Sequence, residues 1–243
     1  GVICTDKTGT ITQNKMTVQR IWVPGRTLNV SGSGYRAQGA VEENGRPVQA
    51  ARDAALGRLC EAASLCTTAH ITRAKDVYDV MGDPTEVAVL VAAAKAGVTK
   101  EALLQQYTVI GENPFDAARK RMSVTVSGPG GVRLLCKGAP DMLLARCTHI
   151  ETPAGPRLLA PRDRADINAA CARMAGKALR VLGFAESSTP AAGEEKLCFL
   201  GLMGMLDPPR PEVRPAVQRC REAGIKPVMI TGDYKETALA IAR

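Results

Sequence analysis

Residues 2–12, VICTDKTGTIT, form a short apolar run that ends at Asp6 and continues into a loop rich in glycine and hydroxyl side chains. A second apolar run at residues 226–231 ends at the Gly-Asp pair 232–233. Each run is typical of a buried parallel strand with acidic groups at its carboxyl end. Residues 211–223 have the spacing of an amphipathic helix. We therefore expect a doubly wound α/β element that is divided between the two ends of the chain.

The middle of the chain has a different pattern, in which short apolar runs predict strands and helical spacing predicts helices. The expected strands are 16–23, 26–30, 123–126 and 132–136, and the expected helices are 51–69, 85–96, 140–147 and 163–178. This mixture predicts an α+β domain, with an antiparallel sheet flanked by helices, inserted into the α/β domain. The expected boundaries are residues 1–14 and 208–243 for the α/β part and 15–207 for the insertion.

Composition restricts the class of protein. The chain has 243 residues, a net charge of +8 and 45% hydrophobic residues, which is typical of a soluble globular protein. Its longest apolar run, residues 197–206, is shorter than the roughly 20 residues that span a membrane, and no targeting segment is evident. The aromatic content of 3% argues against a nucleic-acid partner. The eight cysteines are scattered, which predicts reduced core residues and no zinc site.

The first loop has the chemistry expected for phosphoryl transfer. A carboxylate at the end of a parallel strand, followed by a loop with many backbone N–H groups, suits attack on a phosphoryl group. Asp6 is then the nucleophile. The alternative is that Asp6 caps a turn in which Gly9 supplies a permissive backbone, and an isolated Asp before a Thr-Gly turn would favour that alternative.

The whole nonapeptide CTDKTGTIT at residues 4–12 resembles the phosphorylation signature of P-type ATPases, the ion pumps that form a phosphoaspartate. Further segments follow in that family's order: GDPTE at 82–86, PFD at 114–116, RKRMS at 119–123, KGAP at 137–140, DPPR at 207–210 and ITGD at 230–233. The resemblance covers essentially the whole chain but only part of a pump, because the membrane helices and the actuator domain have no counterpart here. It implies a haloacid-dehalogenase-like phosphorylation domain with an inserted nucleotide-binding domain, at the cytoplasmic face of a membrane.

Within that family, the KGAP and DPPR motifs resemble the type II pumps for calcium, sodium and potassium, or protons. Heavy-metal pumps usually carry a His-Pro pair in the nucleotide domain, whereas His70 and His149 are each followed by isoleucine. The PFD and RKRMS segments are most similar to bacterial calcium pumps. The resemblance thus implies Ca²⁺ as the favoured cation, bound in the missing membrane part, and a bacterial plasma membrane as the location.

The resemblance also assigns an ATP site in the inserted domain. It implies that Phe115 stacks on adenine, an interaction worth roughly 1–3 kcal/mol, although a core phenylalanine is the alternative. Lys120 and Lys137 are expected to place their ammonium groups in the same pocket, with Gly138 next to the second lysine. An edge lysine that only extends its stem over apolar surface is the alternative for Lys137.

Two further nucleotide contacts are implied. Glu86 is expected to hydrogen-bond the adenine amino group or to position Lys120, the alternative being an ordinary acid in the first turn of a helix. Arg180 is expected to contact the phosphates of ATP. The chain differs from the calcium pumps of animal reticulum, which carry an extra arginine where this sequence has Ala117.

Residues 13–15 and 207–210 resemble the two strands of the hinge between the domains. Asp207 and Arg210 are assigned to the nucleotide as well. The phosphate site of the resemblance comprises Asp6, Lys7, Thr8, Thr231, Gly232 and Asp233. Mg²⁺ is expected on the Asp6 carboxylate and the Thr8 backbone carbonyl, because charge on the transferring group has to be neutralised.

Two other functions stay open from the sequence. A soluble haloacid-dehalogenase-type phosphatase with a cap domain should carry an aspartate two residues after the nucleophile, where this chain has Thr8. An ATP-binding module without turnover is the second. The family's Gly-Asp-Gly-x-Asn-Asp motif is absent from this chain, so we expect the isolated chain to hydrolyse ATP very slowly or not at all.

Overall fold

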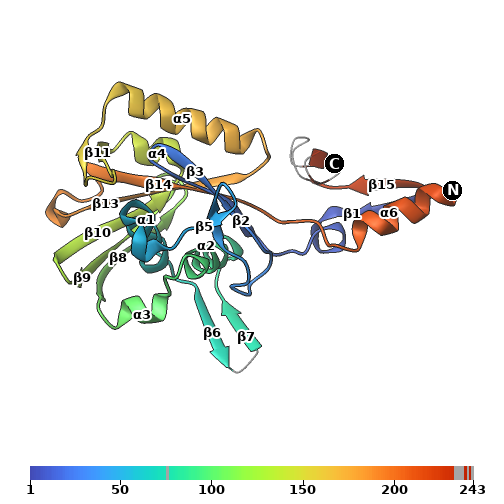
Figure 1. Cartoon of the computed structure of the whole chain (residues 1–243), viewed down its shortest axis with the longest axis horizontal. Helices are drawn as coiled ribbons and strands as arrows, with labels where there is room; N and C mark the ends of the chain where they lie inside the picture. The colour runs from blue at the N-terminus through green and yellow to red at the C-terminus, as the bar shows by residue number, and fades with distance from the viewer. Residues whose placement is uncertain (75–76, 233–237, 240, 242–243) are drawn as a thin grey trace.

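The computed structural model describes residues 1–74, 77–232, 238–239 and 241. Figure 1 shows two parts along the long axis of the molecule: a large sheet with helices on both faces, and a small pair of strands with helix α6 (Val213–Glu222) beside it. The strands of the large sheet lie between Thr17 and Leu206, whereas the small pair consists of β1 (Val2–Asp6) and β15 (Lys226–Ile230).

The small part contains the strand, helix and strand expected at the two ends of the chain. Strands β1 and β15 are parallel, with Asp6 opposite Ile230. Helix α6 (Val213–Glu222) precedes β15, and none of its residues is buried. The wider doubly wound sheet of a haloacid-dehalogenase-like domain is not seen, because β1 and β15 pair only with each other in the described residues.

The large sheet runs in the order β5-β4-β3-β2-β14-β13-β10-β9-β8 and is antiparallel along this path, as expected. Its strands are β2 (Thr17–Val23), β3 (Arg26–Val30), β4 (Val41–Glu43), β5 (Arg46–Pro47), β8 (Thr108–Asp116), β9 (Arg121–Gly128), β10 (Gly131–Gly138), β13 (Arg180–Ser187) and β14 (Leu197–Leu206). The apolar run 197–206 is therefore a central strand. Its first half pairs in parallel with β11 (Cys147–Ile150), which also carries β12 (Arg157–Leu158).

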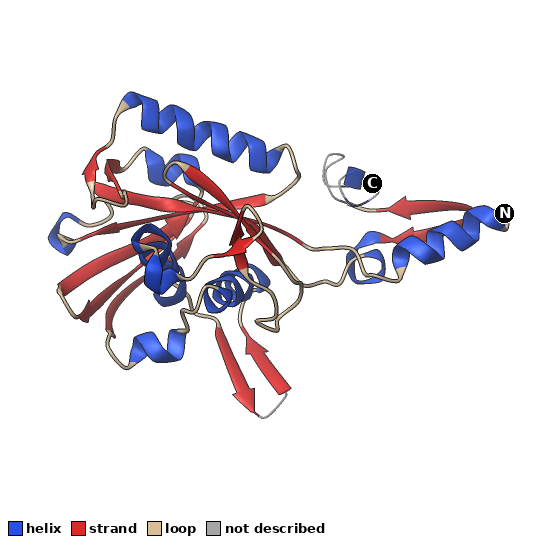
Figure 2. Ribbon diagram, viewed as in Figure 1, coloured by secondary structure: helices blue, strands red, loops and turns tan. Residues whose placement is uncertain are grey.

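Helices cover both faces of this sheet (Figure 2). One core joins α1 (Ala54–Leu65), α2 (Pro84–Lys95) and α3 (Lys100–Leu104) to side chains such as Met122 and Phe184. The other core joins α4 (Pro140–Leu144) and α5 (Pro161–Ala175) to the opposite face, around Phe199. A hairpin of β6 (His70–Ala74) and β7 (Val77–Met81) extends from the large part of the molecule.

Local chemistry explains where the helices differ from expectation. The first begins at Ala54 rather than at residue 51, because Asp53 caps it by accepting a hydrogen bond from the Leu56 N–H at 3.1 Å, and a short 3₁₀ turn (Ala50–Arg52) precedes it. All eight cysteines are unpaired. Four are buried as expected, whereas Cys171, Cys198 and Cys220 are half-buried and Cys4 is exposed. In the described part of the chain, no helix is long and apolar enough to cross a membrane.

Candidate functional site

The GDPTE segment fixes the start of α2. Gly82 has a φ of 124°, and a Cβ there would lie 2.7 Å from the Cα of Ala69, so glycine is required by both backbone and space. Asp83 caps the helix by accepting a hydrogen bond from a backbone N–H two residues later at 2.8 Å, and Pro84 is the first helical residue. The motif thereby places Glu86 in the first turn, facing the segment 67–69.

Both oxygens of the Glu86 carboxylate are engaged. One lies 2.5 Å from the Lys137 ammonium, and the other accepts hydrogen bonds from the Thr67 hydroxyl, the Thr68 hydroxyl and N–H, and the Ala69 N–H, at 2.7 to 3.0 Å. Burial alone would raise the pKa of Glu86, but the Lys137 charge and these donors lower it to about 2. Glu86 therefore positions Lys137 in this structure, rather than Lys120 as the sequence suggested.

Lys100 completes the support of the same segment and was missed by sequence reasoning. Its ammonium donates to the Thr67 carbonyl at 2.8 Å and to the Ala69 carbonyl at 2.9 Å, and burial lowers its pKa. The segment 67–69 is thus held through its N–H groups by Glu86 and through its carbonyls by Lys100. The sequence around Lys100 signals only a helix start after Thr99, which does not indicate where the lysine side chain points.

Lys137 occupies a core-facing position on β10. It lies opposite Met122 on β9 and Phe184 on β13, both of which are buried against α1 and α2. Paired residues on neighbouring strands face the same side of a sheet. The Lys137 side chain is accordingly 8% exposed and directed toward α2, and is not a lysine on an exposed edge strand.

Phe115 lies on the edge strand β8, where the register with β9 is irregular between Asn113 and Asp116. Because Asn113 pairs with Ser123 and Asp116 with Arg121, the irregular stretch lies beside Met122. Phe115 is 64% exposed, which excludes the core alternative. An exposed ring next to the row that contains Lys137 is available to stack on a flat ligand.

Lys120 and Gly138 meet through their backbones. Lys120 is exposed with a φ of 51°, and its carbonyl accepts a hydrogen bond from the Ala139 N–H at 2.9 Å. Gly138 lies opposite Gly183 on β13, the strand that begins at the exposed Arg180. The predicted residues Phe115, Lys120, Lys137, Gly138 and Arg180 are thus brought to one end of strands β8, β9, β10 and β13.

Asp207 and Arg210 are used differently from the expectation. Asp207 accepts hydrogen bonds from the Thr12 hydroxyl at 2.5 Å and the Lys15 N–H at 3.0 Å. Arg210 donates to the carbonyls of Thr12 at 3.1 Å and Gly9 at 2.7 Å. Both side chains therefore bond across the two chain crossings, residues 12–15 and 207–210, that connect the small and large parts. Their contact with a nucleotide stays a prediction.

The small part gathers the predicted phosphate residues. Asp6 and Thr8 are exposed, and Lys7 is buried in the turn (Lys7–Ile11) that follows β1. Since Asp6 lies opposite Ile230, the next residues on β15, Thr231 and Gly232, are close to the same end of the strand pair. The remaining predicted residue, Asp233, lies outside the described residues.

The oxygen donors at this end suit a hard cation. Magnesium prefers carboxylate and carbonyl oxygens, and the Asp6 carboxylate and Thr8 carbonyl are of that kind. Among the residues that the structure describes, no group of three or more His, Cys, Asp or Glu side chains could hold a metal ion. The chemistry of these two donors fits Mg²⁺, and its binding there stays a prediction.

Two features separate the predicted sites. Asp6 lies on the small strand pair, whereas Phe115 and Lys137 lie on the large sheet (Figure 1). A cavity of about 450 Å³ is lined by residues around Arg121 and Glu194, and none of the predicted nucleotide residues lines it. The predicted nucleotide residues therefore lie outside this cavity.

The family model for the cytoplasmic domain N of P-type ATPases matches residues 55–212, which include Glu86, Phe115 and Lys137. The chain belongs to the P-type ATPase family. This assignment agrees with the resemblance drawn from the motifs. The matched region includes most of the large sheet, and β1 and β15 lie outside it.

Curated relatives extend the P-type ATPase match to the whole chain. A calcium-transporting ATPase of Bacillus subtilis is 42% identical over 100% of the chain and 28% of the relative's length. A calcium-transporting ATPase of Bacillus cereus is 38% identical, and a probable cation-transporting ATPase of Mycobacterium tuberculosis is 37% identical, over 26% and 27% of their lengths. The chain thus spans about a quarter of the length of these relatives.

Proposed function

We propose that this chain is the ATP-binding and phosphate-accepting part of a cation pump, with residues 15–207 as the nucleotide-binding domain. Residues 1–14 and 208–243 then belong to a haloacid-dehalogenase-like phosphorylation domain. The observation that carries the proposal is that the exposed Phe115 ring and the buried Glu86–Lys137 pair lie at the same end of neighbouring strands. The ring offers adenine an aromatic face, and the ion pair fixes a cation at the same end of the sheet.

In the proposed reaction, Phe115 stacks on adenine, Lys120 and Lys137 lie in the same nucleotide pocket, and Arg180 contacts the phosphates. A carboxylate oxygen of Asp6 attacks the γ-phosphorus, the bond from that phosphorus to the bridging oxygen breaks, and ADP leaves with the electron pair. Backbone and hydroxyl donors of Thr231 and Gly232 stabilise the transferring group. Asp6 and the Thr8 carbonyl would hold Mg²⁺, which would supply further charge neutralisation.

The nucleotide must travel to Asp6 for this reaction. Reacting atoms have to come within about 3–3.5 Å, and the two sites lie on separate parts of the structure. The parts are joined where Thr12 pairs with Pro209, and Asp207 and Arg210 bond across this crossing. We infer that these crossings act as a hinge whose closure brings ATP to Asp6.

The names of the relatives favour calcium as the transported cation, bound in a membrane part outside this chain. The proposal places the chain at the cytoplasmic face of that membrane, with membrane and actuator domains as its partners. A haloacid-dehalogenase-type phosphatase is disfavoured because Thr8 stands where its general acid would be.

Phe115→Ala tests the nucleotide site. Loss of the stacked ring should weaken ATP binding to the isolated chain by about 1–3 kcal/mol, without loss of stability, because the ring is 64% exposed. Titration calorimetry with ATP measures the affinity. The matched control is Ile110→Ala, which removes a 56% exposed side chain from the same strand and should leave the affinity unchanged. Equal affinities for all three proteins would contradict the site.

Asp6→Asn tests the separation of binding from chemistry. Because Asp6 lies outside the sheet that carries Phe115, we expect the variant to bind ATP with the affinity of the original chain. We also expect both proteins to show almost no magnesium-dependent hydrolysis. Sustained release of phosphate by the original chain, lost in the variant, would show that the chain is sufficient for turnover and that our expectation is wrong.

A further inference from the structure

The segment that carries Phe115 and Lys120 is a tight turn held from within. The Asp116 carboxylate accepts a hydrogen bond from the Arg119 N–H at 2.8 Å, and its carbonyl accepts one from the Lys120 N–H at 2.7 Å. The Arg119 guanidinium donates a hydrogen bond to the Pro114 carbonyl at 2.7 Å. The position of the Phe115 ring therefore depends on where Arg119 is held.

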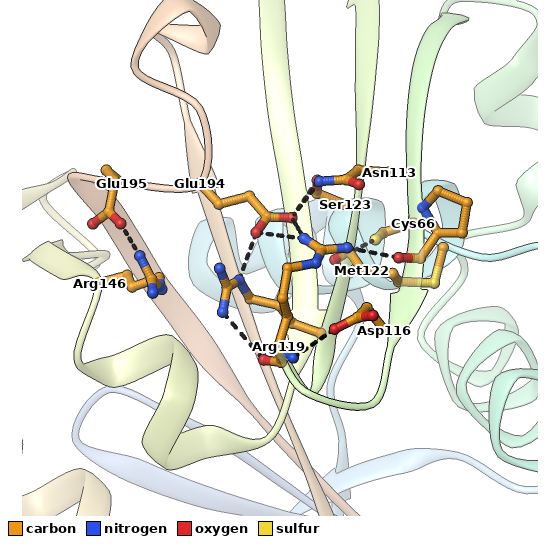
Figure 3. A network of polar contacts seen from close by, with 11 residues as sticks. Cys66, Asn113, Asp116, Arg119, Met122, Ser123, Arg146, Glu194 and Glu195 are labelled. Atoms are coloured by element: carbon orange, nitrogen blue, oxygen red, sulfur yellow. Dashed lines mark hydrogen bonds and ion pairs between the residues drawn. The ribbon is translucent and has the colours of Figure 1, made fainter.

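Glu194 holds Arg119 from a distant part of the chain (Figure 3). Both of its carboxylate oxygens lie 2.7 Å from one Arg119 nitrogen. The same carboxylate accepts hydrogen bonds from Arg121 at 2.6 Å, Ser123 at 2.8 Å and Asn113 at 3.2 Å. All four partners lie within residues 113–123, so a single carboxylate bonds on both sides of the proposed adenine contact.

The Glu194 carboxylate is buried and charged. Its side chain is 10% exposed. Burial alone would raise the pKa of Glu194, but the hydrogen bonds from Arg119, Ser123 and Arg121 lower it overall. Without this carboxylate, the guanidinium groups of Arg119 and Arg121 would repel each other with no anion between them.

The segment that presents Glu194 is itself anchored. It follows a 3₁₀ turn (Pro190–Ala192) and precedes β14, and Gly193 has a φ of 63°, which favours glycine. The next residue, Glu195, forms an ion pair with Arg146, and the Leu197 N–H donates to the Arg146 carbonyl at 3.0 Å. The backbone that carries Glu194 is therefore held in place next to the turn.

Glu194 does not lie on the face of the proposed nucleotide contact. It lines the cavity of about 450 Å³ together with Arg121 and Ser123, and neither Phe115, Lys120 nor Lys137 lines that cavity. Arg121 and Ser123 alternate along β9 with Met122, whose side chain faces α1 and α2 with Lys137. An effect of Glu194 on ATP must therefore pass through the turn.

We propose that Glu194 is a positioning residue for nucleotide binding, which fixes the segment 114–120 so that Phe115 and Lys120 are ordered before ATP arrives. This inference rests on the proposed function. Its physical basis is preorganisation, since an ordered segment loses less conformational freedom when the ligand binds.

The test measures ATP affinity by calorimetry for Glu194→Ala and Glu194→Gln, alone and with Phe115→Ala. We expect Glu194→Ala to weaken binding about tenfold and Glu194→Gln to weaken it less, because glutamine keeps one acceptor oxygen. In the Phe115→Ala background, Glu194→Ala should have a clearly smaller effect, because the ring that it positions is gone. A general loss of structure would weaken binding equally in both backgrounds.

The matched control is Glu186→Gln. Glu186 is 3% exposed and pairs with Arg58 and Arg133, so this variant also removes a buried carboxylate shared by two arginines, away from the turn. We expect it to keep the original ATP affinity. If Glu194→Ala does not fold, Glu194→Gln carries the comparison, with stability followed through the fluorescence of the single tryptophan, Trp22.

The outcomes separate the two proposals. Failure of the original chain to bind ATP, or unchanged affinity in Phe115→Ala, overturns the proposed function. If Phe115→Ala weakens binding but both Glu194 variants bind as the original chain does, only the role of Glu194 is wrong. Equal losses from Glu194→Ala in the two backgrounds would also overturn that role.

Discussion

Glu86→Gln should destabilise the chain by about 3 kcal/mol at pH 7, the free energy that corresponds to the drop in the carboxyl pKa from 4.5 to about 2. Glutamine can still accept hydrogen bonds from the segment 67–69, but its amide would face the Lys137 ammonium as a second donor. Breaking one side of a buried ion pair leaves the other charge uncompensated, and the Lys137 side chain is only 8% exposed.

The stabilisation by Glu86 should depend on pH in a defined direction. The pKa of Glu86 is lower in the folded chain than in the unfolded chain, so its stabilisation is complete above about pH 4.5 and is lost as the pH falls toward 2. Urea unfolding of both proteins, followed through Trp22, should therefore show a difference that is largest at pH 7 and shrinks below pH 4.5. Glu101→Gln, at an exposed position of α3, is the control and should change stability little. A difference that stays constant from pH 7 to pH 3 would exclude this role of Glu86.

The sequence predicted the local elements better than their assembly. The apolar runs 16–23 and 26–30 were sufficient to identify β2 (Thr17–Val23) and β3 (Arg26–Val30), because a short apolar run is a local signal for a strand. The run Leu197–Leu206 did not reveal that it forms the centre of the sheet, since its apolar side chains pack on both faces. Pairing of such a strand depends on partners that are far away in the chain, and a local pattern does not contain them.

In the candidate site too, the sequence indicated individual residues but not the contacts between distant ones. The motifs identified Phe115 and Lys137, but they did not indicate that Glu86 pairs with Lys137, because residues 86 and 137 meet only through the packing of α2 on β10. Lys100 and Glu194 were missed for a similar reason. A charged side chain in an unremarkable local context has no sequence signal for burial, and both became visible only through their partners.

Asp207 and Arg210 have structural contacts that the resemblance did not indicate. The resemblance assigned them to the nucleotide, and the structure engages them with Thr12, Lys15 and Gly9 across the chain crossings. A buried hydroxyl and backbone groups at a crossing need partners, and these two side chains supply them. Their charges therefore set the geometry between the two parts, whatever they contact after closure.

Gly138→Ala should lower both stability and ATP affinity. A Cβ at this position would lie 2.5 Å from the Lys120 carbonyl oxygen and 2.5 Å from the Arg121 Cβ, distances that no real contact tolerates. The end of β10 and the segment 120–121 would have to separate, which breaks the hydrogen bond from the Ala139 N–H to the Lys120 carbonyl. Overpacking of this kind costs about 1–3 kcal/mol.

The expected loss of ATP affinity follows from the displacement of the segment that carries Lys120. Displacement of residues 120–121 shifts Lys120 and disturbs the hydrogen bond from Arg121 to Glu194. ATP affinity should therefore fall by about tenfold, which corresponds to about 1.4 kcal/mol. Gly111→Ala is the matched control on β8, because a Cβ there would meet Thr125 at an ordinary 3.6 Å. Urea unfolding and calorimetry on the same samples measure both effects. A Gly138→Ala protein with the original stability and ATP affinity would mean that the close approach of β10 to Lys120 does not fix the site. In that case the backbone could shift enough to accept the added Cβ, and it could not be what holds Lys120 in place.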